Sequence, residues 1–189
     1  MRSGWKTALL AAGIAAAFTV PIPAAASETY GIVNATFPVP GVMAAGQPTG
    51  EQIQLLAEDG YKTIINLRPR EEPHGFDEPE AARQNGLVYV NVPVTLATLD
   101  QATIDRFLEA MEKAERPVLL HCSSSNRVGG LLYAWMVLEK GMNPEEALKR
   151  AKAAGLHQPE LIDKVTKLVA ERRKQPLRSD RPGSPGGRV

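Results

Sequence analysis

Two spacings of hydrophobic residues alternate along the chain. Apolar runs of five or six residues, rich in Val, Ile and Leu, lie at 62–67, 87–92 and 117–121 and are typical of buried strands. In the segment between the last two runs, Ile104, Phe107 and Met111 recur at the spacing of one helix face. Strands that alternate with helices predict an α/β fold in three layers, with a mostly parallel central sheet flanked by helices.

Capping residues mark where the helices begin. Thr49 followed by Gln52 is a capping box, and Asn143-Pro144 places a favoured cap before a proline at the first helical position. The segment 128–140 is apolar nearly all round, which indicates a helix buried in the core. The expected helices begin at Thr49, Asp77, Thr98 or Asp100, Val128, Asn143 and Pro159.

The segment from His121 to Arg127 joins the strand at 117–121 to this buried helix. Parallel sheets place ligand sites beyond the carboxyl ends of their strands. The unpaired N–H groups and the positive dipole end of the helix favour an anion there, and the same field favours the thiolate of Cys122. Arg127 adds a planar fork of donors suited to an oxyanion. The sequence therefore predicts an anion site with a reactive cysteine.

A structural interpretation of these residues competes with the functional one. Cys122 is a small hydrophobe in that interpretation, and Arg127 is a solvent-facing residue at the start of a helix. An arginine is unfavourable next to the positive end of the helix dipole unless an anion binds. Cys122 is also the one cysteine of the chain, so it cannot form an internal disulfide or a multi-thiolate metal site. These points favour the functional interpretation.

The motifs around this loop resemble a known family. They are His121-Cys-x-x-x-x-Arg127 followed by Val128-Gly129-Gly130-Leu131, with Gly46-Gln47-Pro48-Thr49 and Ile64-Ile65-Asn66-Leu67-Arg68 upstream. From about Pro40 to Gly155 the chain is similar to the phosphatase-like domain of beta-lactamase hydrolase-like proteins, within the dual-specificity and tyrosine phosphatase superfamily. The resemblance implies that Cys122 is the nucleophile and Arg127 the oxyanion clamp. It implies that the substrate is cradled by Ser123, Ser124, Ser125 and Asn126, and it suggests no metal or organic cofactor.

Three departures from the pattern keep other functions open. Phosphatases of this superfamily place five residues between cysteine and arginine, whereas four stand here, a length typical of rhodanese-type sulfurtransferases. Val128 replaces the usual Ser or Thr after the arginine, and Ser125 stands where the group commonly has glycine. A phosphomonoester phosphatase, a sulfurtransferase with a Cys122 persulfide, and a non-catalytic anion- or phosphopeptide-binding module all remain possible.

The general acid of the family has no clear counterpart. Its aspartate would fall near Thr95 and Leu96, and neither side chain can donate a proton. Asp100 is the nearest carboxylate and the candidate acid, but it also suits the helix N-cap, which we favour. The sequence therefore predicts weak protonation of the leaving group, and it places His157 at the surface after a helix stop.

Two arginines follow the strand at 62–67. Arg68 and Arg70 lie just past its carboxyl end, where they can reach the same crevice and bind a second anionic group. Glu71 and Glu72 follow immediately, so a surface ion-pair cluster of little energetic value is an equal alternative.

Composition fits a single globular domain. The chain has 189 residues, 43% of them hydrophobic and 23% charged. A formal charge of +1 gives no reason to expect nucleic acid as a partner. We expect a small phosphorylated or sulfur-donor substrate, or a phosphoprotein, and the sequence does not specify the oligomeric state.

The two ends of the chain differ from its body. Arg2 and Lys6 precede an apolar stretch at 8–20, and Ala24-Ala25-Ala26 follows as a cleavage site, which is the layout of a secretory signal peptide. We expect export to the periplasm or the medium, with no membrane span after cleavage. The predicted domain covers 27–174, and residues 175–189 read as a disordered tail rich in Arg, Pro and Gly.

Overall fold

The computed structural model describes residues 28–174. The predicted signal peptide at 1–26 and the predicted tail at 175–189 lie outside the described residues, so both stay predictions. Between Glu28 and Lys174, no helix is long and apolar enough to cross a membrane.

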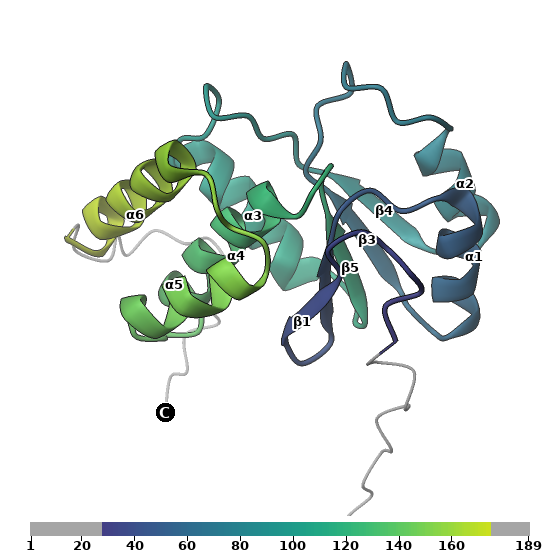
Figure 1. Ribbon diagram of the computed structural model, residues 1–189, viewed down its shortest axis with the longest axis horizontal. Helices are drawn as coiled ribbons and strands as arrows, with labels where there is room; N and C mark the ends of the chain where they lie inside the picture. The colour runs from purple at the N-terminus through teal and green to yellow at the C-terminus, as the bar shows by residue number, and fades with distance from the viewer. Residues whose placement is uncertain (1–27, 175–189) are drawn as a thin grey trace, which may run out of the picture.

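A five-stranded sheet forms the centre of the fold (Figure 1). Its strands lie in the order β1-β2-β5-β3-β4, in which β1 is antiparallel to β2 and every other neighbouring pair is parallel. The last strand is central, because β5 pairs with both β2 and β3. The strands are β1 (Thr36–Val39), β2 (Val42–Ala45), β3 (Thr63–Asn66), β4 (Val88–Asn91) and β5 (Val118–His121).

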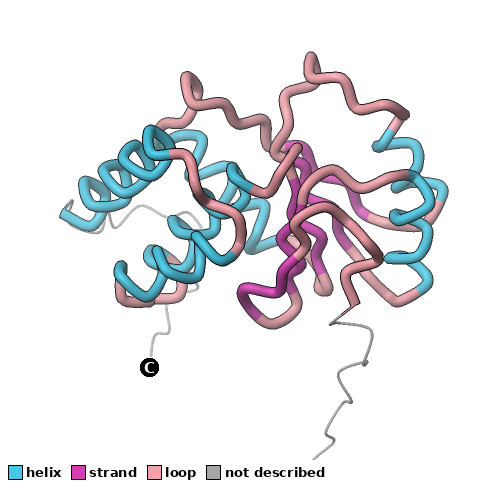
Figure 2. The backbone as a smooth tube through the Cα atoms, in the orientation of Figure 1, coloured by secondary structure: helices cyan, strands magenta, loops and turns pink. Residues whose placement is uncertain are grey.

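Six helices cover the two faces of this sheet. They are α1 (Gly50–Glu58), α2 (Glu78–Gln84), α3 (Gln101–Lys113), α4 (Asn126–Leu138), α5 (Pro144–Ala153) and α6 (Pro159–Lys174). In Figures 1 and 2, α1 and α2 lie on one side of the strands and α3 to α6 on the other. The predicted three-layer α/β fold with a mostly parallel sheet is confirmed.

Alternate residues of the strands serve two separate cores. Met43, Ile64 and Leu119 pack with α1 and α2, whereas Ile65 and Leu120 belong to the larger core on the other face. All five side chains are fully buried, as expected for parallel strands covered on both faces. Burial on both faces explains why these strands read as continuous apolar runs in the sequence.

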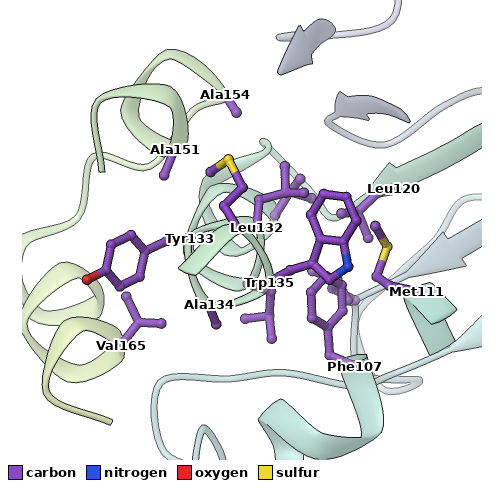
Figure 3. Close-up of a cluster of buried hydrophobic side chains, with 14 of the residues drawn as sticks. Phe107, Met111, Leu120, Leu132, Tyr133, Ala134, Trp135, Ala151, Ala154 and Val165 are labelled. Atoms are coloured by element: carbon purple, nitrogen blue, oxygen red, sulfur yellow. The ribbon is translucent and has the colours of Figure 1, made fainter. Parts of the chain in front are cut away.

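Helix α4 occupies the middle of the larger core. Figure 3 shows Trp135 lying beside Phe107 and Met111, while Tyr133 extends from α4 toward Val165. Every residue of α4 from Val128 to Val137 is buried, which confirms the expectation of a core helix. Its position matters for function because the cysteine loop leads directly into its N-terminus.

Local structure departs from the sequence predictions in two places. Helix α4 begins at Asn126 instead of Val128 and ends at Leu138 instead of Lys140. Strands β1 and β2 form a hairpin that the apolar pattern did not predict. The four residues of β2, Val-Met-Ala-Ala, are mostly small, so they resemble neither an alternating nor a branched apolar strand.

The four parallel strands all end at the same edge of the sheet. Four connections therefore meet there: 46–49 after β2, 67–77 after β3, 92–100 after β4 and 122–125 after β5. This edge is where parallel α/β sheets place their ligand sites.

Candidate active site

The cysteine loop is held by three neighbouring segments. The Cys122 N–H donates to the Ala45 carbonyl at 3.3 Å, and the Gln47 N–H donates to the Ser123 carbonyl at 3.3 Å. Asn34 donates from Nδ2 to the Ser124 carbonyl at 3.1 Å. These bonds fix the loop to β2, to the connection before α1 and to the segment before β1, so its residues are positioned before any ligand arrives.

Ser125 adopts the left-handed conformation that its place in the loop requires. Its φ is +70°, a region that costs an ordinary residue about 1–2 kcal/mol. The buried hydroxyl donates to the Ala154 carbonyl at 2.7 Å, which offsets part of that cost. Gly155 lies against it, and a Cβ added to Gly155 would stand 2.8 Å from the Ser125 Cβ. Serine is therefore tolerated where a glycine would be unstrained.

Cys122 lies at the floor of the loop with no exposed surface. The Arg127 guanidinium lies close enough to Cys122 for the two groups to interact electrostatically. Burial opposes the charge on Arg127, but the contacts with Glu72 and Cys122 outweigh it and raise the pKa of Arg127. The arginine is therefore a fixed cation beside the sulfur.

Glu72 holds Arg127 in place. Nη1 of Arg127 donates to Oε1 of Glu72 at 2.6 Å, and Nη2 donates to Oε2 at 2.9 Å. The same guanidinium donates to the Val94 carbonyl at 3.1 Å and to the Ser123 hydroxyl at 3.0 Å. A planar fork bound at four points has little rotational freedom, which suits a clamp for an oxyanion.

The Glu72 carboxylate is stabilised in its charged form. Its hydrogen bonds to Arg127 lower its pKa most, and those to Arg68 add to this, so that the pKa falls to about 2 although partial burial opposes the shift. Arg68 donates from Nε to Oε2 of Glu72 at 2.9 Å. Glu72 is therefore ionised at neutral pH and does not serve as a proton donor.

A buried polar network supports the loop from below. Nε2 of His121 lies 2.6 Å from Oε1 of Glu78, and both side chains are at most 1% exposed. The other carboxylate oxygen, Oε2, accepts from Gln47 at 3.0 Å and from Asn66 at 3.1 Å. Burial opposes the charge on Glu78, but the contact with His121 and then the hydrogen bond from Gln47 outweigh it and lower its pKa.

Gln47 and Arg68 connect this network to the clamp. Oε1 of Gln47 accepts from Nη1 of Arg68 at 2.5 Å, and Arg68 in turn binds Glu72, the partner of Arg127. A continuous chain of charge-assisted bonds thus runs from Glu78 beneath the sheet edge to Arg127 at the loop. Arg68 is only 7% exposed, so it belongs to this network and not to a surface ion-pair cluster.

A cavity of about 400 Å³ opens above the loop. Three of the four predicted cradle residues, Ser123, Ser124 and Asn126, line this cavity. The fourth, Ser125, is buried within the loop and does not line it. Thr95 and Leu96, the places expected for the family's aspartate, also line it. Its lining consists of Glu72, Thr95, Leu96, Ser123, Ser124, Asn126, Arg127, His157, Gln158 and Leu161.

Asp100 does not line this cavity. Its Oδ1 accepts from the Thr103 N–H at 2.7 Å and caps α3, which confirms the structural interpretation. That backbone bond is the main reason why the pKa of Asp100 is lowered, so the side chain is held as a carboxylate. The structure gives the alternative role of Asp100 as general acid no support.

Two residues of the cavity were not identified from the sequence. Glu72 was expected in a surface cluster, and His157 was expected at the surface with no role. His157 is exposed, yet it lines the cavity beside Arg127. Within residues 28–174, no three His, Cys, Asp or Glu side chains gather where they could hold a metal ion.

Comparison with known proteins supports the resemblance seen in the motifs. A beta-lactamase hydrolase-like protein of Xylella fastidiosa is 38% identical over 115 residues, which cover 59% of this chain and 27% of that protein. One from Agrobacterium fabrum is 38% identical over 87 residues, covering 44% and 20%. The chain thus spans about a quarter of the length of these relatives.

Solved structures share the fold. A Shewanella putrefaciens protein of the DUF442 group, described as a candidate phosphatase, superposes with a TM-score of 0.63 and 27% identity, covering 75% of this chain and 94% of its own. TpbA of P. aeruginosa, solved with phosphotyrosine, gives a TM-score of 0.59 at 19% identity, covering 72% and 83%, and shares the fold alone. A family model described as a DSP-PTPase phosphatase fused to NAD+ kinase matches residues 40–177. That match spans most of the chain, which therefore belongs to this family of dual-specificity phosphatase-like domains.

Proposed function

We propose that this protein is a cysteine-dependent hydrolase of phosphomonoesters. The observation that carries the proposal is the Arg127 guanidinium, which lies close to Cys122, is bonded to Ser123 and is held by Glu72. A fixed cationic fork beside a thiol at a helix N-terminus is suited to a phosphoryl group under attack by sulfur. Membership of the phosphatase-like family supports the same reaction class.

The proposed reaction has two steps. Sγ of Cys122 attacks phosphorus, forming an S–P bond while the P–O bond to the leaving group breaks. Arg127 and the loop N–H groups hold the non-bridging oxygens as charge develops on them. Water then attacks phosphorus, the S–P bond breaks, and the Cys122 thiolate and phosphate are released.

The burial of Cys122 sets a requirement for the substrate. The sulfur has no exposed surface, so the phosphoryl group has to enter the loop and compete with the Ser123 hydroxyl for Arg127. Small phosphorylated molecules and the phosphorylated side chains of proteins both meet this requirement. NADP+ belongs in the substrate panel as well, since the family description names a kinase that acts on NAD+.

Two other functions keep specific support. The loop places four residues between Cys122 and Arg127, and this length favours sulfur transfer through a Cys122 persulfide. The absence of an aspartate at Thr95 and Leu96 favours a module that binds phosphate without hydrolysing it.

One purified sample distinguishes these functions. We expect hydrolysis of p-nitrophenyl phosphate that is lost in Cys122→Ser, and no sulfur transfer from thiosulfate to cyanide. Thiosulfate turnover that depends on Cys122, without phosphatase activity, would assign the sulfurtransferase function. Phosphate binding without either activity would assign the binding module.

We also propose that the chain is exported and loses residues 1–26. The basic start, the apolar stretch and the Ala24-Ala25-Ala26 site support this proposal. Sequencing of the protein isolated from cells should give Ser27 as the first residue. An N-terminus at Met1 in the cytoplasmic fraction would contradict export.

A further inference from the structure

The cavity above the cysteine loop contains few groups that can move a proton. Of its ten lining residues, only Glu72, Arg127 and His157 are titratable. Glu72 is held ionised by Arg127 and Arg68, and Arg127 is a permanent cation. Among the described residues that line this cavity, His157 is therefore the one side chain whose chemistry includes both giving and taking a proton in catalysis.

The segment that carries His157 is attached to the cysteine loop. The N–H groups of His157 and Gln158 both donate to Oδ1 of Asn126, at 2.9 and 3.2 Å. Nδ2 of Asn126 donates back to the Gln158 side chain at 3.3 Å. Because Asn126 is the first residue of α4 and directly precedes Arg127, the position of His157 is tied to that of the clamp.

The imidazole ring is fixed as well. Nδ1 of His157 lies 2.8 Å from the Gly155 carbonyl. A carbonyl only accepts hydrogen bonds, so Nδ1 carries the hydrogen and Nε2 is the nitrogen that gains and loses a proton. Beyond the cavity, the ring also lines a smaller hollow of about 290 Å³, which it shares with Ser124.

We propose that His157 is the general acid and general base of this phosphatase, in the role for which the chain has no aspartate. The inference rests on the proposed hydrolysis. In the first step, Nε2 of the imidazolium gives its proton to the leaving oxygen as the P–O bond breaks. In the second step, the neutral Nε2 takes a proton from the attacking water as the S–P bond breaks. The imidazolium is thereby restored, and no further reactant is needed.

The charged groups around the ring come from several elements. Glu72 and Arg127 line the cavity with it, Lys152 of α5 lines the smaller hollow, and Glu160 follows on α6. Arg127 and Glu72 neutralise each other as a pair. A general acid acts only while it carries its proton, so the first step should slow at alkaline pH.

The test compares leaving groups in His157→Asn and in the native protein. Substrates are aryl phosphates from 2,4-dinitrophenyl phosphate, with a good leaving group, to phenyl phosphate, with a poor one. We expect kcat/KM, which reports the first step, to fall in His157→Asn about 10²–10³-fold on phenyl phosphate and less than about fivefold on the dinitrophenyl ester, whose leaving group needs no proton. The dependence of rate on phenol acidity should become steep, and the alkaline fall in rate should disappear.

Asp100→Asn is the matched control, since asparagine keeps the helix cap while removing the rival carboxylate. We expect it to leave both the rates and their dependence on the phenol unchanged. Vanadate affinity and circular dichroism check that His157→Asn retains a folded loop.

Equal losses on every ester in His157→Asn, or no loss at all, would overturn the role of His157. A steep dependence in Asp100→Asn would assign the acid to Asp100. Hydrolysis of the dinitrophenyl ester that depends on Cys122 tests the proposed function separately, and its absence in the native protein would overturn both proposals.

Discussion

At the residue scale, the clamp depends on the shape of one guanidinium. Arg127 uses two nitrogens for Glu72 and places the same group against Ser123 and Cys122. Arg127→Lys keeps the charge but loses the fork, so we expect kcat/KM for p-nitrophenyl phosphate to fall at least about 100-fold with an unchanged circular dichroism spectrum. Arg83→Lys, at an exposed arginine, is the control. Similar kinetics for both variants would show that Arg127 does not bind the phosphoryl group.

Glu72 makes the pH dependence of stability testable at the same scale. Its pKa is lowered to about 2 in the folded protein. A carboxyl group whose pKa is lower in the folded than in the unfolded protein stabilises the fold at pH values above its unfolded pKa. This contribution is lost as the pH falls toward 2. We expect Glu72→Gln to reduce the free energy of unfolding by about 1–2 kcal/mol at pH 7, because water screens a side chain that is one-third exposed.

Urea unfolding at pH 7 and pH 3 measures this effect. The difference between Glu72→Gln and the native protein should shrink at pH 3, while Glu71→Gln, at the exposed neighbour, should show little change at either pH. A difference that grows toward acid pH would contradict the assignment of Glu72 as an ionised partner of Arg127.

At the scale of elements, neighbouring glycines of α4 have different surroundings. A Cβ at Gly129 would lie 2.6 Å from the Ala151 carbonyl and 2.7 Å from the Leu156 Cβ, whereas at Gly130 the nearest atom is Leu161 Cγ at 3.4 Å. We expect Gly129→Ala to destabilise the fold by about 2–3 kcal/mol, since α5 and the segment after it must move. Gly130→Ala should be neutral or stabilising by up to about 1 kcal/mol. Equal shifts in melting temperature for the two variants would contradict the close packing of Gly129 against α5 and the segment after it.

Elements set by local chemistry could be predicted from the sequence. The capping box at Thr49 and Gln52, the caps at Asp100 and Asn143, and the buried helix α4 are all confirmed. These features depend on residues a few positions apart. The β1–β2 hairpin was missed because its short strands have no alternating pattern, although Pro40-Gly41 between them is a turn signal.

At the scale of the whole molecule, the site is assembled from segments that are distant in sequence. The cysteine loop could be predicted, because it follows a central strand and precedes a buried helix. Glu72 and His157 could not, since they lie 55 and 30 positions from Arg127, and Glu72 contacts it and His157 lines the same cavity only where the connections converge. Which of several exposed charges faces the loop is decided by tertiary packing, which leaves no periodic trace in the sequence.

The most direct test of the account is to identify the group carried by Cys122 during turnover. The native protein is mixed with 2,4-dinitrophenyl phosphate, denatured within the first turnovers and digested, and the peptide containing Cys122 is examined by mass spectrometry. We predict one phosphoryl group on that cysteine, absent in Cys122→Ser and more abundant when the second step is slowed in His157→Asn. An active enzyme whose Cys122 peptide never carries phosphate, or one that carries only an added sulfur atom after exposure to thiosulfate, would contradict the account.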